Sequence, residues 1–341
     1  MAFDNRVTTL TESKLMPKVV DTILDSNVLT GRTLRNSKRF TGTQMQFPVK
    51  FEATTDGGFF SGAEVHTTTA TSNRIKISFD PKFYEKSVTI LKTEATVNQT
   101  AGKQKVLDLI KTELKSKAQD AADAIGTALY SSNATDSKQF LGLQDIVDDG
   151  GTVATYGGQS RATYSTIGGV DTASGGTLSL DKLATLYNNI TSGAVMPSSI
   201  YTTPSVFSYY EKLLQPQERI YKNPSLYAGG LKGSTGFTTL EYKGIPVLAD
   251  EKCTSGYLYM LNEKFLNFYS MQMIDTSTIA TADTDIVGND YSKNSGFGFT
   301  YIPGWLTPTN QSAWVTHIYL CGEFISENPK RQGVLTGITG V

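Results

Sequence analysis

The side chains that most often carry chemistry are scarce in this sequence. Two histidines (His66 and His317) and two cysteines (Cys253 and Cys321) are the whole supply among 341 residues. A zinc site would need nearly all four of them together, and a disulfide framework needs more cysteines than these. No nucleophile elbow of the form Gly-x-Ser-x-Gly occurs. We therefore expect structural histidines, with no catalytic residue, no bound cofactor and no metal site.

Two segments match ligand-binding loops only in part. Residues 228–235 (AGGLKGST) have the glycines of a phosphate-binding loop, but a glycine follows Lys232 where the motif requires Ser or Thr. Residues 281–290 contain Asp283, Asp285, Gly288 and Asp290, which resemble part of a calcium loop. Counted from Asp283, however, the fifth position is Val287, which has no oxygen ligand in its side chain, and the twelfth is Asn294 and not glutamate. Incidental calcium binding stays open there, and both segments are expected to be surface loops.

Charge is balanced overall but unevenly distributed along the chain. Lys and Arg number 31 and Asp and Glu number 32, so no global attraction to nucleic acid is expected. Residues 1–39 are basic, and residues 271–292 contain four aspartates and no Lys or Arg. Four basic residues of the first segment are grouped: Arg32, Arg35, Lys38 and Arg39. The two segments could meet across a subunit interface, or each could be a solvated surface.

Neither a membrane span nor a secretory signal is expected. No apolar run approaches the length of about 18 residues that a spanning helix needs. The first residues, MAFDNRVTTLTESK, lack a basic region followed by an apolar stretch. We therefore expect a protein that is assembled in the cytoplasm.

Alternating apolar residues predict a long hairpin. Residues 40–52 and 73–79 each alternate apolar with polar side chains, as a strand with one apolar face does. The glycine-containing stretch between them places Phe59, Phe60 and Glu64 at the tip. A two-stranded ribbon has no core of its own, so we expect it to lie on a neighbour.

The remaining elements predict an α+β protein. Residues 100–131 carry an apolar stripe at helical spacing, which predicts a helix of about 45 Å. Shorter helices are expected at 16–24, 179–190 and 204–214. Strands are expected at 198–203, 237–242, 245–248, 257–261, 266–273 and 314–324, with a possible strand at 162–167. Helices and strands interleave without a βαβ repeat, which indicates the α+β class.

Three stretches and the order of parts resemble the major capsid protein of tailed bacteriophages with the HK97-like fold. The stretches are GFFSGAEVHTTTATSNRIKISF, GIPVLADEKCTSGYLYMLNEKFL and VTHIYLCGEFISENPKRQGVLTGIT. They contain an acid in the hairpin (Glu64), a Gly-x-Pro-Val turn and an Asn-Pro-basic ending, as many phage coat proteins do. The resemblance covers essentially the whole chain.

The resemblance implies a division into five parts. They are an N-terminal arm (1–39), an E-loop hairpin (40–92), a peripheral domain with the spine helix (93–178), an axial domain (179–262) and a return to the peripheral domain (263–341). The boundary after about residue 261 stays open, because the strand at 266–273 could belong to either domain.

The resemblance also implies a function and partners. Many copies would assemble through pentamers and hexamers into the icosahedral head of a virion, built in the host cytoplasm around double-stranded DNA that is contacted non-specifically. Inter-subunit contacts would come from Arg32, Arg35, Lys38 and Arg39 in the arm and from Phe59, Phe60 and Glu64 in the hairpin. A separate scaffolding protein, a portal and decoration proteins are the implied partners. Since no lysine lies near Glu64 in the hairpin, we expect non-covalent closure, and we expect no cleaved N-terminal segment.

Two other functions remain to be distinguished. An encapsulin-like nanocompartment shell shares the fold but would enclose an enzyme cargo. An enzyme with a ligand site in the α/β region is the third hypothesis, and convergent titratable groups in one pocket would support it.

Overall fold

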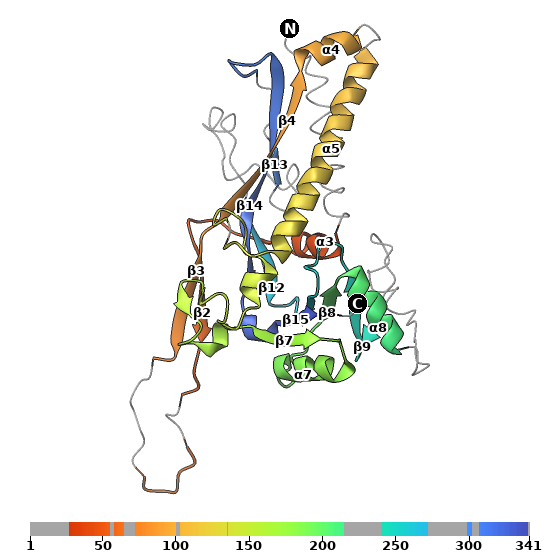
Figure 1. Ribbon diagram of the computed structural model, residues 1–341. Helices are drawn as coiled ribbons and strands as arrows, with labels where there is room; N and C mark the ends of the chain where they lie inside the picture. The colour runs from red at the N-terminus through yellow and green to blue at the C-terminus, as the bar shows by residue number, and fades with distance from the viewer. Residues whose placement is uncertain are drawn as a thin grey trace.

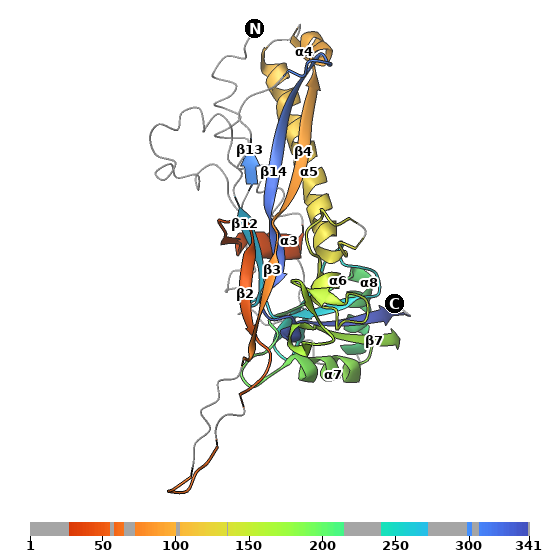
Figure 2. The same ribbon diagram turned by 90° about the vertical axis from the view of Figure 1, so that its left-hand side faces the viewer.

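The computed structural model describes residues 27–54, 58–64, 72–99, 103–134, 136–214, 240–271, 299–301 and 307–339. A compact α/β region carries two extensions in opposite directions (Figures 1 and 2). A long helix lies beside a pair of long strands on one side, and a narrow hairpin projects on the other. The predicted helix at 16–24, both predicted loops (228–235 and 281–290) and His66 lie outside the described residues.

One long strand, β14 (Ala313–Ser326), organises a five-stranded sheet. It pairs antiparallel with β4 (Lys82–Leu91), β12 (Leu266–Met271) and β13 (Phe299–Tyr301), and β12 pairs parallel with β1 (Lys38–Arg39). The strand predicted at 314–324 is thus confirmed and is longer at both ends. The sequence did not lead us to predict β4, which continues the chain from the hairpin into this sheet.

The long helix α5 (Lys103–Tyr130) packs along β4, after a short helix α4 (Lys92–Gln99). The described part of its predicted apolar stripe is buried: Ile110, Leu114, Ala118, Ala121, Ile125 and Leu129 are each at most 2% exposed. Small alanine side chains in this stripe let neighbouring elements approach closely. The helix predicted at 100–131 is confirmed.

Part of the predicted N-terminal arm belongs to the core. Helix α3 (Val28–Arg35) packs against α5 and β12, with Val28, Leu29 and Leu34 buried. The amide of Asn27 donates to the carbonyl of Ala122 in α5, at 3.4 Å. Residues 28–35 therefore do not extend away from the subunit.

A second sheet has the strand order β7-β15-β11-β8-β10-β9. Its members are β7 (Val170–Gly176), β15 (Gly333–Ile338), β11 (Leu258–Leu261), β8 (Ser199–Thr202), β10 (Ile245–Ala249) and β9 (Leu240–Tyr242). The predicted helices are confirmed as α7 (Leu180–Ile190), capped by the Ser179 hydroxyl, and α8 (Pro204–Leu214), and both pack on this sheet.

The second sheet differs from the predicted division of the chain. Strand β7 was placed in the part 93–178 and β15 in the part 263–341, yet both lie in the sheet that the axial part 179–262 forms. Strand β12, whose membership was open, pairs with β14 in the other sheet. The possible strand at 162–167 is wrong, because residues Ser165–Ile167 form a 3-10 helix, η2.

Several short elements connect the two sheets. They are α6 (Leu143–Ile146), the small hairpin of β5 (Thr155–Tyr156) and β6 (Gln159–Ser160), and the 3-10 helix η6 (Pro329–Arg331). The projecting hairpin consists of β2 (Met45–Lys50) and β3 (Arg74–Phe79), which confirms the two strands predicted at 40–52 and 73–79.

Candidate assembly surfaces

The two faces of the hairpin have opposite character. Its inner face is apolar and packs on the body of the subunit: the ring centroid of Phe47 lies 5.2 Å from that of Tyr269, and Phe79 lies 5.0 Å from Tyr156. The outer face is exposed and polar. It carries Gln46, Pro48 and Lys50 from β2 and Arg74 and Lys76 from β3. Alternation along each strand thus separates a face for the subunit from a face for solvent or a partner.

The two edges of the hairpin also differ. On the β3 edge, the N–H of Ser78 donates to the carbonyl of Gly157 (3.0 Å), and the Gln159 amide donates to the carbonyl of Lys76 (3.1 Å). These bonds show that the backbone C=O of Lys76 points away from β2. Lys76 and its cross-strand partner Pro48 therefore form a non-hydrogen-bonded pair, in which the backbone polar groups of Pro48 also point outward, toward the free edge of β2. Pro48 has no N–H, so the β2 edge lacks a donor at its centre.

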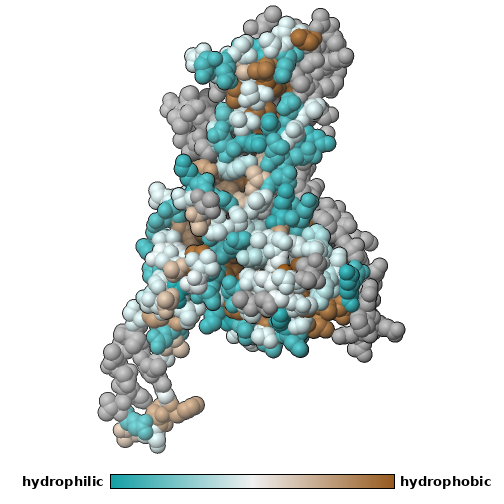
Figure 3. All heavy atoms as spheres, in the orientation of Figure 1, coloured by the Kyte–Doolittle hydropathy of each residue, from teal (hydrophilic) through white to brown (hydrophobic). Residues whose placement is uncertain are grey.

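The hairpin tip exposes aromatic side chains. Phe59 is fully exposed (109%) and Phe60 is 64% exposed, and Glu64 is also exposed. Figure 3 shows apolar residues at the far end of the hairpin, remote from the rest of the surface. Large exposed apolar groups on such a projection indicate a contact with another molecule.

The four grouped basic residues do not behave alike. Nη2 of Arg32 lies 2.8 Å from Oε2 of Glu263, and Nζ of Lys38 lies 2.5 Å from Oε1 of Glu327, so both pair within their own chain. Arg35 and Arg39 are exposed. Burial raises the pKa of Glu327, but hydrogen bonds from Lys38 and Tyr269 outweigh it and hold that pKa below its usual value. The inter-subunit role of these four residues remains a prediction.

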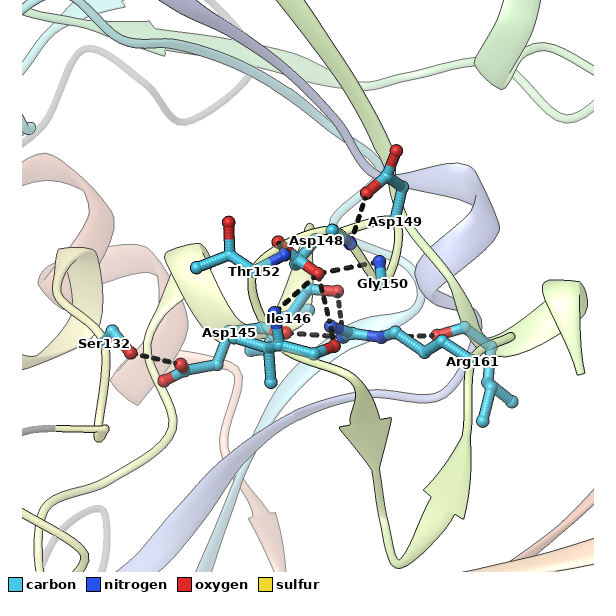
Figure 4. A network of polar contacts seen from close by, with 11 residues as sticks. Ser132, Asp145, Ile146, Asp148, Asp149, Gly150, Thr152 and Arg161 are labelled. Carbon is cyan, nitrogen blue, oxygen red and sulfur yellow. Dashed lines mark hydrogen bonds and ion pairs between the residues drawn. The ribbon is translucent and has the colours of Figure 1, made fainter. Parts of the chain in front are cut away.

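A buried arginine organises the segment that links α5 to the second sheet (Figure 4). The side chain of Arg161 is 0% exposed and lies 3.3 Å from Oδ1 of Asp148. It also donates to four backbone carbonyls, those of Asp145, Ile146, Val153 and Ile167. Burial lowers the pKa of Arg161, and the charge of Asp148 opposes that shift. Sequence reasoning missed this centre, although the run DDGG at 148–151 is a turn signal beside it.

Carboxylates complete the same centre. Asp148 accepts the N–H groups of Gly150, Thr152 and Val153, while Asp145 accepts the hydroxyl of Ser132 (2.5 Å). Each buried charge is thus satisfied by local donors. The arrangement fixes the shape of a loop.

The histidines and cysteines form no catalytic group in the described part of the chain. Nδ1 of His317 lies 2.6 Å from Oε1 of Glu85, and its ring stacks on Tyr319 at a partly exposed position of β14. Cys253 and Cys321 are buried free thiols, and burial raises the pKa of Cys321 to about 11. Among the described residues, no cluster of three or more His, Cys, Asp or Glu could hold a metal ion. Nor does any described helix have the length and apolarity to cross a membrane.

Comparison with solved structures identifies the fold. The chain is similar to the capsid asymmetric unit of cyanophage A-1(L), with a TM-score of 0.62 and 15% identity over 92% of this chain and 93% of that one. It is also similar to the capsid protein of a native GTA particle (TM-score 0.57, 11% identity, 93% and 91% covered). A third match is the SrpI encapsulin of Synechococcus elongatus PCC 7942 (TM-score 0.55, 11% identity, 89% and 85% covered).

Comparison of the sequence alone identifies no family. No protein-family model matches the chain, and no curated protein matches it. The structural similarity nevertheless extends over more than nine tenths of the chain for the first two structures. The chain therefore has the HK97-like α+β fold of phage capsid and encapsulin shells.

Proposed function

We propose that this chain is the major capsid protein of a tailed phage. Many copies assemble through pentamers and hexamers into an icosahedral head that encloses double-stranded DNA. The observation that carries the proposal is the similarity to the cyanophage A-1(L) capsid over nearly the full length of both chains. The fold alone is shared by proteins of several functions, so the proposal needs the surfaces as well.

The described surfaces support a shell subunit. The hairpin projects from the body with an exposed aromatic tip, and the side chains of its outer face are exposed in the part of the chain that the structure describes. An isolated two-stranded ribbon is marginal in water, whereas one that lies on an adjacent copy gains a second packing partner. Contacts between unlike surfaces of identical subunits close into rings, which are the units of an icosahedral shell.

Within this proposal the predicted parts and partners keep their roles. The residues before α3 act as the arm, the β2–β3 hairpin acts as the E-loop, and the two sheets with their helices act as the peripheral and axial domains. Arg35, Arg39, Phe59, Phe60 and Glu64 contact neighbouring copies. A separate scaffolding protein, a portal and decoration proteins act during or after assembly in the host cytoplasm. The finished shell is the capsid of the virion.

Electron microscopy and mass photometry of the purified, untagged chain test the proposal. We expect closed shells, or pentamers and hexamers that close into shells when a scaffolding protein is supplied. A monomer or dimer that stays unassembled at high concentration with the scaffold present would contradict it.

The similarity to the SrpI encapsulin supports a second candidate, a nanocompartment shell. The two candidates differ in the contents of the shell. Particles isolated from the native source should contain nuclease-protected double-stranded DNA if the chain is a phage capsid protein. Particles that contain a single cargo enzyme and no protected DNA would favour the nanocompartment.

A further inference from the structure

The outer face of the hairpin carries positive charges that repel one another. Lys50 of β2 lies directly opposite Arg74 of β3, and Lys76 follows on the same face. All three are exposed, and no ion pair joins them to a described acid. Like charges directly opposite in a sheet destabilise it, and the pair Lys50–Arg74 is of the closer, non-hydrogen-bonded kind. Glu52, an exposed acid, lies beyond the paired strands, and against this one acid the three cations leave the face with a positive net charge.

A second surface of the same chain has the opposite charge. Asp148, Asp149 and Asp171 lie close together beside α6 and β7: the N–H of Gly169 donates to the carbonyl of Asp148 (2.8 Å), and Asp148 and Asp171 line one cavity. Asp171 accepts the hydroxyl of Thr336 (3.4 Å), but only Asp148 is paired with a described cation, Arg161. Burial raises the pKa of Asp171, and the negative charge of Asp149 raises it further. Asp149 is exposed. This surface is therefore also unfavourable for an isolated subunit.

The acidic surface borders a small polar cavity. A space of about 70 Å³ is lined by Asp148, Asp171, Tyr259 and Thr336, among others. The hydroxyl of Tyr259 is buried, and Thr254 and Asp171 are among the groups that lie near it. The carboxylate of Asp171 at this cavity suits an ammonium group, which offers three donors and a positive charge.

We propose that the cationic outer face of the hairpin in one copy docks on the acidic surface at Asp149 and Asp171 of a second copy. A lysine of the hairpin, Lys50 or Lys76, donates to the carboxylates at the cavity. Each surface relieves the self-repulsion of the other, so the contact is favourable only between copies. The inference rests on the proposed function, and it specifies which two surfaces meet.

The geometry of such a contact is head-to-tail. The two surfaces lie on different elements, the β2–β3 hairpin and the α6–β7 region, so one copy offers each of them to a different neighbour. Contacts of this heterologous kind continue from copy to copy until the ring closes. Charge pairing also fixes the register of the docked hairpin, which apolar contact alone does not.

Charge reversal tests the contact. The double variant Lys50→Glu/Arg74→Glu and the single variant Asp149→Lys should each raise the concentration needed for assembly by about tenfold or more. Adding Lys50→Glu to Asp149→Lys should lower the concentration needed for assembly most of the way back toward that of the wild type. A matched control, Lys115→Glu/Lys212→Glu, makes the same charge change at exposed positions of α5 and α8 and should assemble like the wild type. Asp171→Asn removes the charge of the half-buried carboxylate without adding bulk, and it should also raise the concentration needed for assembly.

Zero-length cross-linking tests the contact without variants. A carbodiimide joins a lysine amine to a carboxylate that it touches, and mixed ¹⁴N- and ¹⁵N-labelled subunits identify links between copies. We expect peptides that join Lys50 or Lys76 to Asp149 or Asp171, with both isotopes in one product. Normal assembly of Lys50→Glu/Arg74→Glu, or shells without such links, would overturn the contact and leave the proposed function intact. Failure of the wild type to assemble would instead contradict the proposed function.

Discussion

Arg161 carries a buried positive charge whose partners all come from one stretch of chain, residues 145–167. Its guanidinium group spans several carbonyls at once, which the point charge of a lysine cannot do. We expect Arg161→Lys to lower the free energy of unfolding by about 3–5 kcal/mol, because the lysine ammonium group cannot reach all four carbonyls and each buried carbonyl left without a donor costs about 1–3 kcal/mol. Urea unfolding measures the change. The exposed Arg39→Lys should stay within about 0.5 kcal/mol of the wild type.

Glu323 is a buried acid in β14 that accepts the N–H groups of Leu141 (2.7 Å) and Phe324 (3.1 Å). Burial raises its pKa from 4.5 to about 8, and these two bonds oppose the shift. Between those values the native protein holds a proton that the unfolded chain releases. The free energy of unfolding should therefore fall as pH rises through this window, by at most about 1.4 kcal/mol per pH unit.

The variant Glu323→Gln isolates this contribution. An amide carries no titrating proton yet still accepts an N–H, so the fall in stability between pH 4.5 and about 8 should largely disappear. Urea midpoints measured across that range give the comparison. An unchanged pH profile in Glu323→Gln would show that another group titrates; Glu94→Gln, at an exposed position of α4, is the matched control.

At the scale of elements, the hairpin edge at β2 is protected by one residue. Pro48 removes the donor that would let another strand extend the sheet, while the β3 edge is covered by residues 157–159. We expect Pro48→Thr to increase fibrillar aggregation at high concentration, measured by thioflavin fluorescence and light scattering. Gln46→Thr adds the same side chain at an exposed position whose N–H is already present, and it should not aggregate more than the wild type.

Elements with a local pattern were predictable from the sequence. The alternation of Ile75, Ile77 and Phe79 and the stripe from Ile110 to Leu129 each repeat with the period of their element. Strand β7 (VDTASGG) has no such pattern, because its position depends on pairing with β15, which lies more than 150 residues later in the chain. The same holds for the ion pair Arg32–Glu263, which no spacing in the sequence reveals.

Of the two candidate surfaces, one could be predicted from the sequence and the other could not. The aromatic tip could be recognised because Phe59 and Phe60 stand in a glycine-rich stretch. The acidic surface could not, because Asp171 approaches Asp149 only through the fold of the segment around Arg161. Local composition therefore indicated where the chain projects, whereas tertiary structure was needed to show what the projection could meet.

At the scale of the whole molecule, a substitution at the hairpin tip should affect assembly but not the stability of the fold. Phe59 is fully exposed, so Phe59→Ser should change the free energy of unfolding by less than about 0.5 kcal/mol. If the tip contacts a neighbouring copy, the same change should raise the concentration needed for shell formation, measured by mass photometry. Met196→Ser removes an exposed apolar side chain between α7 and β8 and serves as the control. Equal assembly of all three proteins would exclude the tip as a contact.

Strand β15 lies between β7 and β11, parallel to the first and antiparallel to the second. Residues 170–261 can therefore leave the ribosome while the strand that joins β7 to the rest of the sheet is still missing. Until residues 333–338 have been synthesised, β7 has no described partner strand, and the subunit cannot present its finished surface. The order of translation thus delays the completion of this sheet until residues 333–338 have left the ribosome.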